Sequence, residues 1–158
     1  MTDPGFRRGV RIAVDLGEVR IGVAACDADG VLAFPVSTVR AGPDEIAALL
    51  TVMREYEPIE VLVGLPRSLA GGEGPAVVRV RERAERLAGA VGVPVRLVDE
   101  RLSTVTAAQR LRAAGRTAKQ QRGIIDAAAA AAILEHALAL ERGLGAPPGE
   151  LVSAPGVD

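Results

Sequence analysis

Short apolar runs alternate along the chain with amphipathic stretches, and this pattern predicts a mixed α/β protein. Apolar runs bounded by glycine, proline or acidic residues predict five strands, at residues 10–15, 20–26, 31–39, 59–65 and 93–99. Turn residues join the first three strands closely, which indicates an antiparallel meander. The last two strands each follow a helical stretch, so we expect them to be parallel. The fold class is therefore an α/β domain whose five-stranded mixed sheet is flanked by helices.

Helical spacing of apolar residues predicts the elements between and after these strands. The predicted helices span residues 43–56, 75–91, 103–115 and 117–142. The second of them has an apolar stripe and leaves several arginines more exposed: Arg79, Arg81, Arg83 and Arg86. The glycine-containing loop at residues 66–74 is polar and is predicted to be functional.

Length and composition indicate one folded domain. The 158 residues, 49% of them hydrophobic, suffice for a packed core at residues 10–142. Residues 1–9 are predicted to be a flexible N-terminus and residues 143–158 a disordered, Gly/Pro-rich tail. The longest uncharged apolar run, residues 127–134, is too short to span a bilayer, so a cytoplasmic protein is expected. The single cysteine, Cys26, argues against structural zinc and is expected to pack in a strand.

The charge balance leaves the partner open. A net charge of −1 neither supports nor excludes nucleic acid, and only Phe6, Phe34 and Tyr56 are aromatic. Base stacking therefore has few side chains available. Any nucleic-acid binding should depend on the backbone and shape of the ligand.

Carboxylates lie at the ends of three predicted core elements. Asp15 ends the first strand, Asp99 and Glu100 end the fifth, and Asp126 opens the apolar part of the last helix. Because a buried, unpaired carboxylate is costly, these positions suggest one shared divalent-metal site for phosphodiester chemistry. Strand alternation leaves open whether Asp99 or Glu100 is the ligand, and we favour Glu100. Glycine at position 17 lets the backbone after Asp15 approach a phosphate or metal.

Each carboxylate also has a purely structural interpretation. Asp15 could satisfy turn amides, and Asp126 could form an intrahelical pair with Arg122, one turn before it. Helical geometry nevertheless places Asp126 on the core-facing side, together with Ala130, Ile133 and Ala137. Lys119 lies two turns before Asp126 and either contacts the scissile phosphate or is a solvated surface residue. No metal-ligand partner lies near His136, which is interpreted as a surface or packing residue.

Taken together, these motifs resemble the YqgF or RuvX family of the RNase H-like superfamily, described as Holliday-junction resolvases and pre-16S ribosomal RNA nucleases. The resemblance covers residues 10–142. It rests on Asp15-Leu16-Gly17-Glu18-Val19-Arg20-Ile21-Gly22, Val63-Gly64-Leu65-Pro66 with Gly71-Gly72-Glu73-Gly74, Asp99-Glu100-Arg101-Leu102-Ser103-Thr104, and Ile125-Asp126-Ala127-Ala128. It implies an RNase H-like fold and a metal-dependent nuclease with Asp15, Glu100 and Asp126 as catalytic carboxylates. Residues 67–70 and 80–84 differ from the usual pattern of the family, and these differences affect the expected substrate contacts more than catalysis.

From this resemblance follow a set of expected ligands and partners. The metal ligands would be Asp15, Glu100 or Asp99, and Asp126, holding Mg²⁺ or Mn²⁺, as two ions. The partners would be pre-rRNA or branched DNA, pre-ribosomal particles and, for a resolvase, a second copy of the chain. Nucleic-acid contacts are assigned to Arg20, Arg101, Lys119 and Arg122.

Two other functions remain open. One is a non-catalytic nucleic-acid or ribosome-assembly module, which the arginine-rich helices would suit. The other is an actin-like phosphate-binding ATPase, because Asp15-Leu16-Gly17 before a hairpin also resembles the first phosphate loop of those enzymes. The chain looks short for the two lobes of that architecture, and no second glycine-rich phosphate loop follows a later strand.

Overall fold

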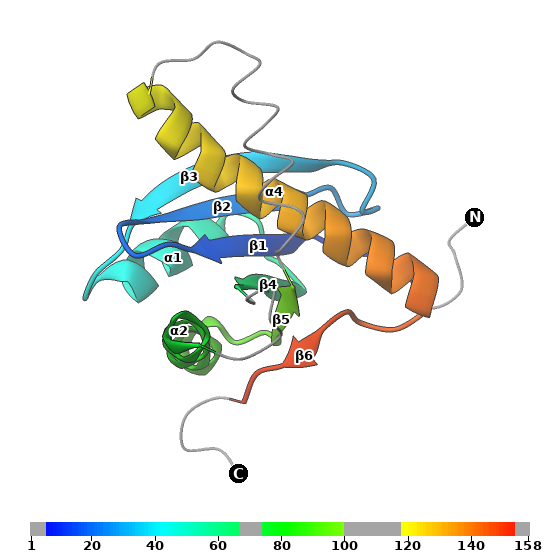
Figure 1. Ribbon diagram of the computed structural model, residues 1–158. Helices are drawn as coiled ribbons and strands as arrows, with labels where there is room; N and C mark the ends of the chain where they lie inside the picture. The colour runs from blue at the N-terminus through cyan, green and yellow to red at the C-terminus, as the bar shows by residue number, and fades with distance from the viewer. Residues whose placement is uncertain (1–5, 67–73, 100–117, 154–158) are drawn as a thin grey trace.

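The computed structural model describes residues 6–66, 74–99 and 118–153, which form a six-stranded sheet with helices on both faces (Figure 1). In α4, side chains are described from Asp126 onward. The elements in chain order are β1 Arg11–Leu16, β2 Arg20–Cys26, β3 Ala33–Arg40, α1 Glu45–Arg54, β4 Glu60–Leu65, α2 Pro75–Val91, β5 Val95–Asp99, α4 Ala118–Leu144 and β6 Glu150–Leu151.

The strand order is β3-β2-β1-β4-β5-β6, which confirms the predicted mixed sheet. Strands β1, β2 and β3 pair antiparallel in sequence order. Strand β4 pairs parallel with β1, and β5 pairs parallel with β4. The prediction of five strands is wrong by one, because β6 pairs antiparallel with β5. The sequence pattern missed β6 because it is two residues long and lies within the segment predicted to be a tail. The predicted helix at residues 103–115 lies outside the described residues, as does most of the predicted 66–74 loop.

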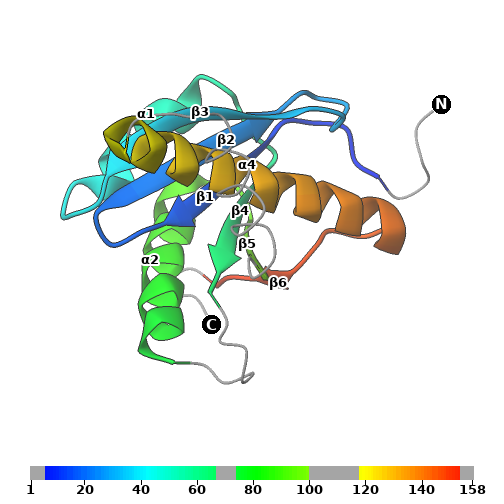
Figure 2. The same cartoon turned by 45° about the horizontal axis from the view of Figure 1, so that its top comes forward.

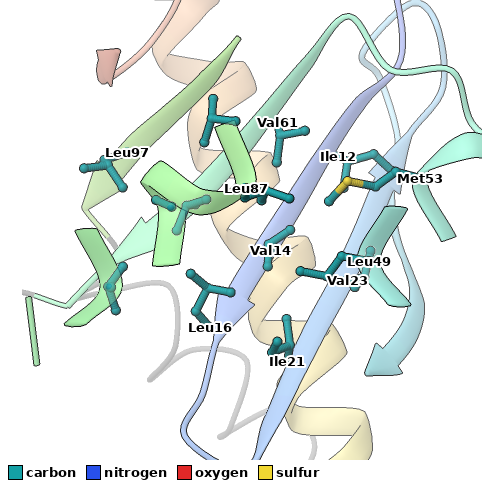
Figure 3. Packing of buried hydrophobic residues seen from close by; sticks show 14 of the residues in the cluster. Ile12, Val14, Leu16, Ile21, Val23, Leu49, Met53, Val61, Leu87 and Leu97 are labelled. Carbon is teal, nitrogen blue, oxygen red and sulfur yellow. The ribbon is translucent and has the colours of Figure 1, made fainter. Parts of the chain in front are cut away.

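The two faces of the sheet carry different helices (Figures 1 and 2). Alternate residues of each strand point to opposite faces, and the apolar residues sort accordingly. Ile12, Val14 and Leu16 of β1 pack with α1 and α2, in the cluster that Figure 3 shows with Leu49 and Leu87. Ala13 of β1 lies in the other cluster, under α4. This alternation assigns the side chains of β1, β4 and β5 to one face or the other up to the strand ends.

Helix α4 crosses β1, β2 and β3 on a stripe of small and branched residues. Ala130, Ile133 and Ala137 are fully buried, which confirms the core-facing side predicted for this helix. Ala24 of β2 packs directly against Ala130, so small side chains on both elements let the helix lie close to the sheet. Within the described ranges, no helix is both long and apolar enough to cross a membrane.

Candidate active site

Asp15 lies near the carboxyl end of β1, on the face covered by α4. Its neighbours Val14 and Leu16 belong to the opposite cluster, so alternation directs Asp15 toward α4. The residue paired with it on β2 is Gly22, which has no side chain on that face. After Asp15 the chain turns tightly, because the Gly17 amide donates to the Asp15 carbonyl at 3.0 Å. A Cβ atom at Gly17 would lie 2.3 Å from the Arg20 carbonyl oxygen, which explains the glycine.

Asp126 reaches this part of the sheet because α4 rests on the backbone of Gly22. A Cβ atom at Gly22 would lie only 1.8 Å from the Asp126 carbonyl oxygen, so no other residue fits there without moving the helix. Gly22 is also the strand partner of Asp15. Asp126 therefore lies over the β2 position next to Asp15, and the backbones of Asp15 and Gly22 are separated by one strand spacing of about 4.8 Å.

An ion pair ties Asp126 to the sheet. Arg20 Nε donates to Asp126 Oδ2 at 2.8 Å, and both side chains are partly exposed, at 35% and 25%. Arg20 is paired with Arg40 on β3, and alternation puts both on the α4 face. Like charges directly opposite each other destabilise a strand pair, and the Asp126 carboxylate offsets this repulsion. Arg20 was predicted to contact nucleic acid, and the structure gives it a carboxylate partner as well.

The second acidic position separates into two residues with different surroundings. Leu97 of β5 packs in the cluster under α1 and α2, and Val98 packs under α4. Asp99 therefore follows the α2 face by alternation, away from the face of Asp15. Glu100 and Arg101 lie outside the described residues. Lys119 and Arg122 fall within α4, but their side chains are not among those described, so the alternative Arg122–Asp126 pair is not tested.

The described part of the site holds two carboxylates, Asp15 and Asp126, on one sheet face. Among the described residues, no group of three or more His, Cys, Asp or Glu side chains could hold a metal ion. The oxygen donors of the pair nevertheless suit a hard cation such as Mg²⁺ or Mn²⁺. Glu100, the third carboxylate predicted from the sequence, lies outside the described residues.

A second charged group, which the sequence interpretation missed, lies at the other end of the α4 face. We call Arg7, Arg11, Glu60, Arg96 and Glu141 the ion cluster. Arg11 Nη2 donates to Glu141 at 2.7 Å, and both side chains are 1% exposed. Arg7 Nη2 bridges Glu141 at 2.5 Å and Glu60 at 2.9 Å. Arg96 Nε also donates to Glu60, at 2.9 Å.

Hydrogen bonding in the ion cluster controls protonation. Burial alone would raise the pKa of Glu141, but hydrogen bonds from Arg7 hold it below its ordinary value. Burial alone would lower the pKa of Arg7, but its bonds to Glu141 and Glu60 raise it. Glu141 and Arg7 therefore stay charged at neutral pH. Its signal in the sequence was a charged residue at or near the start of three strands, Arg11, Glu60 and Arg96.

Sequence comparison finds close relatives over nearly the whole chain. A family model described as "RuvX: Holliday junction resolvase" matches residues 9–140. A protein of Streptomyces coelicolor is 60% identical over 151 residues, which cover 93% of this chain and 90% of that relative. A protein of Streptomyces avermitilis is 59% identical over 150 residues, covering 92% and 96% respectively. Both relatives carry the name "Putative pre-16S rRNA nuclease".

Structure comparison finds a similar fold in a more distant protein. Thermus thermophilus RuvC is 23% identical and superposes with a TM-score of 0.53, over 88% of this chain and 99% of RuvC. The same protein in complex with a Holliday junction substrate gives a TM-score of 0.51, over 89% and 99%. At this identity the likeness concerns the fold, and it confirms the mixed α/β architecture with helices flanking the sheet that was expected from the sequence.

Proposed function

The chain belongs to the RuvX family of Holliday junction resolvases, and from this premise we propose that it is a metal-dependent endonuclease that matures the 5′ end of 16S ribosomal RNA. The main support is the 60% identity, over 93% of the chain, to a relative whose name assigns it to pre-16S rRNA. Asp15 and Asp126 would supply oxygen ligands for the metal ions that such a reaction needs.

We assign the catalytic carboxylates to Asp15, Glu100 and Asp126. The contact of Asp126 with Gly22, the strand partner of Asp15, supports the first and third. The alternation of β5 supports Glu100 over Asp99, because Asp99 falls on the face away from Asp15. Three carboxylates from separate elements form an all-oxygen donor set.

When bound, Mg²⁺ or Mn²⁺, proposed as two ions, would activate water and stabilise the leaving oxygen of the phosphodiester. The protein's part is to hold its carboxylates where those ions bind. Gly22 fixes the depth of α4 and thereby the position of Asp126. Arg20 orients the Asp126 carboxylate through its hydrogen bond at 2.8 Å.

Positive charge beside the carboxylates would hold the substrate backbone. Arg20 and Arg40 face each other across β2 and β3 at this end of the sheet. Asp126 compensates Arg20, so the pair retains a net positive charge that suits a phosphate. We keep Arg101, Lys119 and Arg122 as further proposed contacts to nucleic acid.

Holliday junction resolution is the second candidate function. The description of the matching family model favours it. A junction resolvase cuts two strands symmetrically, so this function would require a homodimer with two active sites. For the favoured function, we propose a cytoplasmic protein that associates with pre-ribosomal particles.

Cleavage by matched variants tests the proposal. We expect Asp15→Asn to lower Mg²⁺-dependent cleavage of a pre-16S rRNA 5′ fragment on the order of 1,000-fold, because it removes a ligand charge. The control is Asp29→Asn, an exposed carboxylate whose only ion pair among the described residues is with Arg8 at 3.6 Å. It should cleave like the wild type.

A four-way DNA junction assayed in parallel separates the two candidate functions. Junction cleavage without rRNA cleavage would replace the favoured function by resolution. If the Asp15→Asn variant is folded, as measured by circular dichroism, and still cleaves at the wild-type rate, the assigned site is refuted.

A further inference from the structure

A surface pocket of about 480 Å³ lies between α1, α2 and the β1–β2 turn, on the face of the sheet opposite α4. Arg79, Arg83 and Arg86 of α2 line one wall of it. Their spacing of four and three residues puts them on one stripe of the helix. Two carboxylates, Glu18 and Glu45, also line the pocket, so its formal charge is +1 in a chain of net charge −1.

One of these arginines ties the pocket to the active-site strand. Arg83 donates to both carboxylate oxygens of Glu45, at 2.9 and 3.1 Å. Its Nη1 also donates to the carbonyl oxygen of Leu16 at 3.2 Å. Leu16 directly follows Asp15, so the inner wall of the pocket is one residue along the chain from the proposed catalytic carboxylate. The pocket and the active site therefore flank the same strand end from opposite faces.

The other two arginines are available to an anion. Arg79 pairs with Glu18 at 2.9 Å, but the side chains are 55% and 77% exposed. Such surface pairs contribute little stability, so a phosphate can displace Glu18 at small cost. Arg86 is exposed, and among the described residues it forms no hydrogen bond or ion pair. A guanidinium offers paired N–H donors that match phosphate oxygens.

We propose that this pocket binds a backbone phosphate of the nucleic acid, on the strand that passes over the carboxyl end of β1 from the active site. The inference rests on the proposed function. Arg79 and Arg86 would contact the phosphate, and Arg83 would be a positioning residue. No aromatic side chain lines the pocket, so it recognises backbone charge and no base. An RNA strand bound at the active site holds its neighbouring phosphate close to the pocket, so the effective concentration of that phosphate is high. A free phosphate ion has no such advantage.

Binding measured without divalent metal tests this pocket separately from catalysis. The probe is a fluorescein-labelled pre-16S rRNA 5′ fragment, titrated in EDTA at several KCl concentrations and followed by fluorescence anisotropy. We expect Arg86→Gln and Arg79→Gln each to weaken binding by roughly 3- to 10-fold and to reduce the salt slope by about 1. A variant that has lost one phosphate contact releases fewer counterions when it binds RNA, so its affinity depends less steeply on salt concentration.

Arg54→Gln is the matched control. Arg54 is an exposed arginine at the end of α1 that lines a different pocket, and it should bind RNA with the wild-type salt slope. Equal affinity and slope in Arg86→Gln, Arg79→Gln and Arg54→Gln would overturn the pocket proposal.

The cleavage assay keeps the two proposals apart. If the wild type fails to cleave while Arg86→Gln still lowers affinity, the proposed function fails and the pocket stands. If the wild type cleaves while Arg86→Gln binds RNA with normal affinity, the proposed function stands and the pocket proposal fails. Inorganic phosphate at about 10 mM, on the order of a weak surface affinity and at constant ionic strength, tests the free ion. If it raises the melting temperature of the wild type but not of Arg86→Gln while both bind RNA equally, the pocket is a free-phosphate site and the strand proposal is wrong.

Discussion

The two ends of the sheet face under α4 both carry carboxylates, but these carboxylates differ in how deeply they are buried. At the ion cluster, Glu60 and Glu141 are each 1% exposed and each bound by two arginines. At the active-site end, Asp126 is 25% exposed and is bound by Arg20, which is itself 35% exposed. The two ends are about 22 Å apart along the helix, at 1.5 Å per residue.

The difference in exposure between the two ends shows that a buried carboxylate needs charged partners. A buried carboxylate without partners costs several kcal/mol, so Glu60 and Glu141 need their arginine partners in the folded chain. A carboxylate that keeps contact with water tolerates incomplete pairing and can accept an external cation. The same functional group, a carboxylate, is therefore structural at one end of α4 and suited to metal binding at the other.

The largest expected effect comes from Glu141→Gln. Gln keeps the volume of the side chain but leaves Arg7 and Arg11 without its charge, so unfolding free energy should fall by about 3–5 kcal/mol. Asp126→Asn at the other end should cost less than about 1 kcal/mol, because its ion pair is partly exposed. Urea denaturation measures both. Similar losses for the two variants would remove the distinction between the ends.

The Glu141 contribution should also depend on pH in a defined direction. Burial opposes ionisation, but the Arg7 hydrogen bonds hold the folded-state pKa of Glu141 below its ordinary value of 4.5. A lowered pKa gives a stability contribution that is complete above pH 4.5 and is lost as pH falls through the folded-state pKa. The gap between wild type and Glu141→Gln should therefore be constant from pH 7 to 5 and shrink in more acidic buffer. A gap that widens with acid would contradict this assignment.

An intermediate effect is expected from Gly22→Ala, which tests how α4 is held at the active-site end. The new methyl group would lie 1.8 Å from the Asp126 carbonyl oxygen, so the helix must shift. Overpacking of this kind costs about 1–3 kcal/mol. Gly143→Ala is the control in α4 itself, because no atom lies within 4 Å of the position that its new methyl group would take. Thermal unfolding should separate them, and equal melting temperatures would mean that the close approach at Gly22 imposes no constraint.

The smallest effect is expected from Arg20→Gln. It breaks the pair with Asp126 but also removes the repulsion between Arg20 and Arg40, so the change in unfolding free energy should stay below about 1 kcal/mol. Urea denaturation at low and at high NaCl concentration should give a difference that is small in both and smallest at high salt, because salt screens both interactions. A loss of unfolding free energy above about 2 kcal/mol, on the scale of buried pairs, would show that the Arg20–Asp126 pair stabilises the fold as the buried ion cluster does.

Local patterns along the chain were enough to predict much of this architecture. Short apolar runs located β1 to β5, and helical spacing located α1, α2 and α4. The carboxylates Asp15 and Asp126 were recognisable because each lies beside a mainly apolar run, where a charge is costly. Strand β6 escaped prediction, because two residues after a glycine at φ 78° carry no periodic signal.

The sequence is sufficient to say which apolar positions are buried and which positions carry charge, because both follow from local periodicity and side-chain chemistry. It does not say which charges meet, and that outcome comes from the packing of distant segments. The pairing of Glu141 with Arg7, 134 positions away, and the contact of Asp126 with Gly22 depend on strand register and on how closely α4 lies on the sheet. Neither quantity is encoded in any short segment, since both result from packing the whole domain.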